Sequence, residues 1–137
     1  MLLRTHLLFA WCWILVGLFS GTLQGLRFHH DDWLGGYASW PRRLTRLGHV
    51  AFLGTALLNI AFALSATALR LDPAGLAAPS ALLLAGAVTM PVVCYLSAWR
   101  KALRPLFAVP VVTLVSGVAF FVTAILSGPG LPGVAGS

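Results

Sequence analysis

The chain has 137 residues, of which 59% are hydrophobic and 9% charged, and it carries a formal net charge of +6. A soluble domain carries about 25% charged residues, so this composition excludes an ordinary soluble domain and indicates a membrane protein. The positive charge does not indicate nucleic-acid binding, because the Lys and Arg residues flank the apolar blocks, where membrane proteins place them against lipid headgroups.

Four apolar blocks of about 20 residues each predict four membrane-spanning helices. We expect them over residues 5–27, 47–69, 79–99 and 105–126. They predict an all-α fold: an integral membrane four-helix bundle, antiparallel because the connections are short, with a short interfacial segment between the first two helices. This domain occupies residues 1–127, and residues 128–137 form a Gly- and Pro-rich tail that we expect to be flexible.

The second helix is expected to begin before its membrane-spanning part, near Trp40. Ser39 is a preferred N-cap residue, since its hydroxyl oxygen accepts a hydrogen bond from a backbone N–H of the first turn. Pro41 suits that turn because its missing N–H would have no partner there. Gly35 and Gly36 predict a tight turn just before this helix.

The basic residues predict the orientation of the chain in a bacterial inner membrane. Seven of the nine Lys and Arg residues fall at the first and third connections, and only Arg4 and Arg70 fall on the other side. Positive charge is retained in the cytoplasm, so both termini are expected to be extracytoplasmic. We expect six of the seven to lie among the lipid headgroups: Arg42, Arg43, Arg46, Arg100, Lys101 and Arg104.

Histidines and aspartates gather where the first block ends and the second begins, and they are a candidate metal or haem site. The set is His29, His30, Asp31, Asp32 and His49. Imidazole and carboxylate suit zinc, copper and iron, and one histidine of the adjacent pair could face His49 across two antiparallel helices. The spacing matches no metal-binding signature, however, and these residue types are equally at home in a solvated turn. His6 starts the first block and should lie about 30 Å away, at the opposite surface.

Two patterns inside the apolar blocks predict close helix packing. Gly17, Gly21 and Gly25 follow each other at four-residue intervals and give one helix face without side chains, against which another helix can pack closely. Asn59 lies within the second block, where an unpaired amide is costly, so we expect it to find a partner inside the bundle. Thr89 and Ser116 are the expected partners because they lie at a similar predicted depth.

No nucleophile–base pair and no phosphate-binding glycine loop appear in the sequence. We therefore expect a small, non-enzymatic accessory or scaffolding subunit that works beside other membrane protein subunits in the lipid bilayer. In size and architecture the predicted bundle resembles the small accessory subunits of bacterial respiratory and photosynthetic complexes, and this resemblance implies no site residues. The alternative is a redox protein that holds a metal or haem at the histidine cluster.

Overall fold

The structure is a computed structural model and describes residues 1–128. It contains four long helices: α1 (Leu2–Gly25), α2 (Trp40–Ala68), α3 (Ala77–Trp99) and α4 (Ala108–Ser127). Three short 3₁₀ helices lie in the connections: η1 (Trp33–Gly35), η2 (Pro73–Leu76) and η3 (Lys101–Phe107). Each of the four helical regions is long and apolar enough to cross a membrane, so the predicted all-α, four-span antiparallel fold is confirmed.

The helix ends follow local signals in the sequence. The Ser39 hydroxyl accepts a hydrogen bond from the Arg42 backbone N–H at 3.3 Å, and α2 begins at Trp40 as predicted. The turn before it contains Gly35 and Gly36 with φ of 86° and 92°, a backbone region that favours glycine. The fourth helix was expected from residue 105, but α4 begins only at Ala108, because η3 extends through Pro105 to Phe107. Of the predicted tail only Gly128 is described, and the rest lies outside the described residues.

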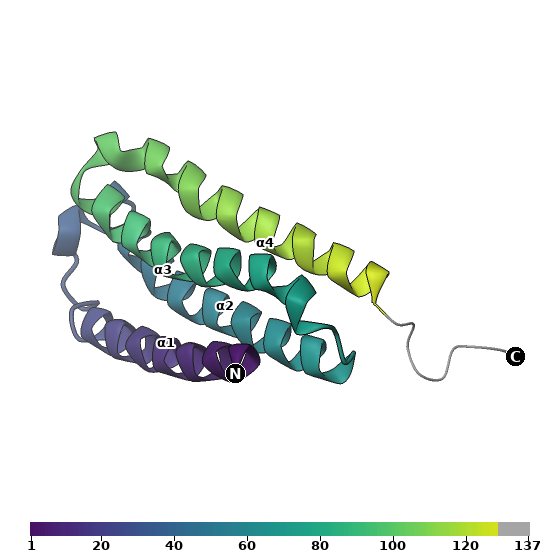
Figure 1. The fold of residues 1–137 in the computed structure, drawn as a ribbon. Helices are drawn as coiled ribbons and strands as arrows, with labels where there is room; N and C mark the ends of the chain where they lie inside the picture. The colour runs from purple at the N-terminus through teal and green to yellow at the C-terminus, as the bar shows by residue number, and fades with distance from the viewer. Residues whose placement is uncertain (129–137) are drawn as a thin grey trace, which may run out of the picture.

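The helices lie side by side in chain order (Figure 1). Helix α2 packs between α1 and α3, and α4 packs on the far side of α3. The apolar core lies at the end of the bundle that holds the N-terminus, where Phe62, Leu76 and Leu83 are almost fully buried. The Phe62 ring packs edge-on against Phe121 of α4, with 4.7 Å between the ring centres. The two outer helices keep large apolar faces exposed, which suits a lipid surrounding.

Two of the three α1 glycines lie directly against α2. A Cβ atom on Gly17 would stand 3.0 Å from the Phe52 Cβ, and one on Gly21 would stand 2.5 Å from the His49 ring carbon Cε1. A Cβ on Gly25 would meet nothing within 4 Å. This glycine face therefore packs within the chain over Gly17 and Gly21, and Gly25 lies beyond the contact.

The contrast between these glycines gives the first prediction. We expect Gly21→Ala to destabilise the protein by roughly 1–3 kcal/mol relative to Gly25→Ala, because the added methyl group must displace the His49 ring. Gly25→Ala is the matched control: it makes the same change on the same helix, at its last residue, where the added methyl group would meet nothing. Thermal unfolding of both variants in detergent measures the difference. Equal unfolding temperatures would contradict the packing described here.

Candidate functional site

The structure does not bring the five candidate metal ligands together. His29 and His30 are exposed in the turn after α1, with their rings tilted by 40° and their centres 4.0 Å apart, and Asp31 and Asp32 are exposed beside them. His49 lies farther along α2, where its Nδ1 is 2.9 Å from the Gly17 carbonyl oxygen. Within residues 1–128 no group of three or more His, Cys, Asp or Glu side chains is placed to hold a metal ion. The reason is that His49 lies nine residues inside α2, about 14 Å along the helix from Trp40.

Asn59 bonds inside the bundle, but its partner differs from the two expected. Its Oδ1 is 2.6 Å from Nδ1 of His6, and Nε2 of His6 is 2.7 Å from the Ser80 hydroxyl. Thr89 instead bonds to the Ala85 carbonyl of its own helix. The partner follows from the register of the helices: Asn59 is nine residues from the end of α2 at Ala68 and lies level with His6 and Ser80, which are near the starts of α1 and α3.

These hydrogen bonds identify Nδ1 of His6 as a hydrogen-bond donor. The Asn59 amide group donates to the Thr55 carbonyl at 2.8 Å, which leaves Oδ1 as the acceptor for His6 Nδ1–H. Nε2 is bonded to the Ser80 hydroxyl, which can donate a hydrogen bond to the ring or accept one from it. The order Ser–His–Asn matches the hydrogen-bond order of a hydrolase triad. His6 and Asn59 are 0% exposed and Ser80 is 5% exposed, so a substrate has no access and the role is structural.

Three hydrogen bonds at regular spacing link α1 to α3. His6 bonds Ser80, the Trp13 indole N–H donates to the Ala87 carbonyl at 3.1 Å, and the Ser20 hydroxyl bonds the Tyr95 hydroxyl at 2.7 Å. The α1 residues are seven apart, which returns them to one face of a helix. Because α1 and α3 run parallel, the same register holds along both helices. The two helices are thereby fixed relative to each other on either side of α2.

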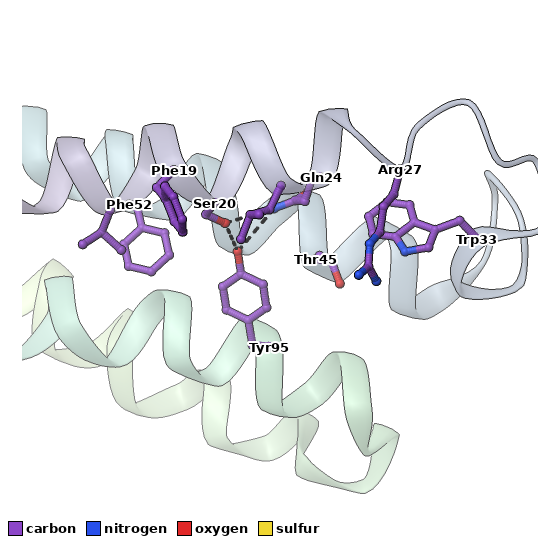
Figure 2. A pocket seen from close by; sticks show the side chains of 10 residues that line it. Phe19, Ser20, Gln24, Arg27, Trp33, Thr45, Phe52 and Tyr95 are labelled. Carbon is purple, nitrogen blue, oxygen red and sulfur yellow. Dashed lines mark hydrogen bonds between the residues drawn. The ribbon is translucent and has the colours of Figure 1, made fainter.

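A groove of about 480 Å³ opens beside the last of these links (Figure 2). Its walls are mostly apolar and come from Val16, Phe19 and Leu23 of α1 and Phe52 of α2. Its polar corner is built from Ser20, Gln24 and Tyr95: the Gln24 amide N–H group donates to the Ser20 oxygen at 3.2 Å and to the Tyr95 oxygen at 3.4 Å. An apolar cavity with a few convergent polar groups is typical of a small-molecule binding site.

Arg27 and Trp33 lie at one end of the groove (Figure 2). From Val16 to Arg27 the helical rise is about 16 Å, close to half of the roughly 30 Å hydrocarbon core of a bilayer. A second cavity of about 390 Å³ shares Thr45 and Tyr95 with the groove and adds Leu34 and Trp99. The groove therefore runs from mid-helix to the end of the bundle that holds the basic residues.

Arg42 does not lie among headgroups as expected, because it is 3% exposed. Its guanidinium donates to the carbonyl oxygens of Phe28 at 3.2 Å and Asp31 at 3.3 Å, and it stacks over the rings of Phe28, Trp33 and Tyr37. The carbonyls after a helix end have no helical partner, so a five-donor side chain on the next helix satisfies them. Arg42 thus holds the segment that carries Trp33. Arg43, by contrast, is exposed.

Sequence reasoning missed Tyr95 and the role of Arg27. Tyr95 lies inside a long apolar block, and its polar partners are 71 and 75 residues away in the chain. The signal that could have found the groove is the pair Ser20 and Gln24, four residues apart on one face of α1, followed by Arg27 just after the helix end. Comparison with protein-family models, curated proteins and solved structures finds no match to this chain. The candidate site therefore rests on its geometry.

The buried His6 network gives the second prediction. We expect Asn59→Leu to destabilise the protein by about 1–3 kcal/mol, because it removes the acceptor of a buried N–H. This exceeds the average of about 0.6 kcal/mol for side-chain hydrogen bonds in membranes. Thr89→Val is the control, since the Thr89 hydroxyl bonds only within its own helix. Unfolding in detergent compares the two, and an Asn59→Leu protein as stable as the control would refute the role of the network.

Proposed function

We propose that this four-span membrane protein is non-enzymatic and binds a membrane lipid in the groove between α1 and α3. One acyl chain lies along Val16, Phe19 and Phe52, and the polar head reaches Arg27 and Trp33. The observation that carries the proposal is the groove itself: it is apolar along its length, polar at one corner and cationic at its end.

The dimensions of the groove favour a lipid over a soluble ligand. From Val16 to Arg27 it extends about 16 Å, close to the depth of one leaflet. Its open side lies on the outside of the bundle. An acyl chain enters the groove directly from the surrounding hydrocarbon and gains van der Waals contacts with the protein, whereas a soluble ligand would first have to cross into the bilayer. Trp33 at its end is a residue type enriched at membrane interfaces.

The membrane and the orientation belong to the same proposal. We place the protein in a bacterial inner membrane with both termini extracytoplasmic. This orientation is supported by the seven basic residues at the connections that follow α1 and α3, which lie at the same end of the helix layer (Figure 1). The groove then opens to the cytoplasmic leaflet.

The accessory or scaffolding subunit is the second candidate function. Its support is the layered arrangement, in which α1 and α4 are the outer helices and leave broad apolar faces for partner subunits. The glycine face of α1 does not support a contact with a partner subunit, because Gly17 and Gly21 pack on α2 of the same chain. Recovery of a second chain with the native protein in mild detergent, without bound lipid, would favour this candidate over lipid binding.

Filling the groove tests the lipid-binding proposal. We expect Thr45→Phe to reduce acyl-chain labelling of the groove several-fold, because the new ring occupies space that Thr45 now lines. The full-length protein is placed in phosphatidylcholine nanodiscs that contain a diazirine-labelled phosphatidylcholine, and adducts are mapped by mass spectrometry. In the native protein the adducts should concentrate on Phe19 and Leu23 rather than on Leu15.

The matched control for this test is Val50→Phe. It adds a phenyl ring to the same helix at a residue that is 57% exposed and does not line the groove. Its labelling pattern should equal that of the native protein. Adducts spread evenly over groove and outer residues, or a pattern that Thr45→Phe leaves unchanged, would contradict the proposal.

Reporter fusions test the orientation. An alkaline phosphatase joined after Gly128 should be active, and a green fluorescent protein at the same position should be dark, because the charge distribution directs both termini out of the cytoplasm. The reverse result would place the groove in the other leaflet.

A further inference from the structure

A third cavity, separate from both the lipid groove and the 390 Å³ cavity beside it, lies between the start of α2 and η3. Its volume is about 690 Å³, and it shares no lining residue with the groove between α1 and α3. Two cations, Lys101 and Arg104, line it together with the Trp40 indole. Lys101 Nζ lies 5.7 Å from the centre of that indole, and the Arg104 guanidinium carbon lies 5.1 Å from it.

The indole is held in place by its own hydrogen bond. Trp40 Nε1 donates to the Ser97 carbonyl oxygen at 2.9 Å, which ties the ring to the end of α3. The Trp40 ring is therefore held in place beside both side chains. Cation–π contact of this kind is worth about 0.5–1 kcal/mol at an exposed site.

The charges in this cavity are not balanced by the residues that line it. Two like charges lie over one ring, and no carboxylate is among the lining residues. The chain has three acidic residues: Asp72 caps η2 at the other end of α2, and Asp31 and Asp32 lie in the turn after α1 and do not line the cavity. An external anion between Lys101 and Arg104 would offset their mutual repulsion and add hydrogen bonds to both.

The walls of the cavity identify the kind of anion. Leu44, Leu47 and Phe107 line it next to the two cations. Free phosphate would gain nothing from these apolar side chains, whereas a phospholipid would use both parts of the cavity. We propose that Lys101 and Arg104, held on Trp40, bind the phosphate of an anionic phospholipid whose acyl chains lie along Leu47 and Phe107. The lipid would join α2 to the connection between α3 and α4.

The test measures retention of phosphatidylglycerol by the full-length protein in phosphatidylcholine nanodiscs, followed by native mass spectrometry. The double variant K101Q/R104Q should lose about thirtyfold in phosphatidylglycerol affinity, the factor that corresponds to about 1 kcal/mol per basic side chain at a membrane surface. Both side chains are exposed, so the fold should be kept, and K101R/R104K, which keeps both charges, should retain most of the binding.

R43Q/R46Q is the matched control, since it removes two charges from the start of α2 outside this cavity. Retention by the control and loss by K101Q/R104Q would support the site. Equal losses in the two double variants would overturn it, because general attraction to a basic surface would then explain the binding. Displacement of the lipid by millimolar glycerol phosphate would also overturn it, since the apolar walls would then contribute nothing.

Discussion

The hydrocarbon core of a bilayer offers no water to buried polar groups, and the arrangement of these helices depends on that constraint. His6, Asn59 and Ser80 must satisfy one another, and they do so through bonds of 2.6 and 2.7 Å that join α1, α2 and α3. The Trp13 and Ser20 bonds repeat the link at seven-residue intervals along α1. Together they set the register of α1 against α3. That register places Tyr95 of α3 beside Ser20 and Gln24 of α1, at the polar corner of the groove.

Glycine determines how closely the same helices approach. Gly17 and Gly21 let α2 come near enough for His49 to reach the Gly17 carbonyl, and Gly48 of α2 leaves room for the Tyr95 ring of α3. Because Gly48 has no side chain, the Tyr95 ring can pass α2 and reach Ser20. Close packing at these points and the hydrogen bonds beside them leave the groove on the flank of the bundle.

The basic end of the molecule combines two different uses of arginine. Arg42 is buried, and its two terminal guanidinium nitrogens donate to backbone carbonyls, so it stabilises the segment that carries Trp33. Arg27 and Arg104 are exposed and line cavities. At one end of the bundle, arginine therefore has a structural role where it is buried against backbone carbonyls, and its charge is available to an anion where it is exposed.

The sequence by itself determined the features that depend on neighbouring residues. Hydropathy over about 20 residues predicted four spans, Ser39 and Pro41 predicted the start of α2, and Gly35–Gly36 predicted the turn before it, because each is a local property of the backbone or its solvent. Only the tertiary structure decided which side chains meet. Asn59 bonds His6 rather than Thr89, His49 lies apart from His29, and Arg42 is buried. Such pairings depend on the register and rotation of whole helices relative to one another, and residues that are neighbours in the chain do not determine either of them.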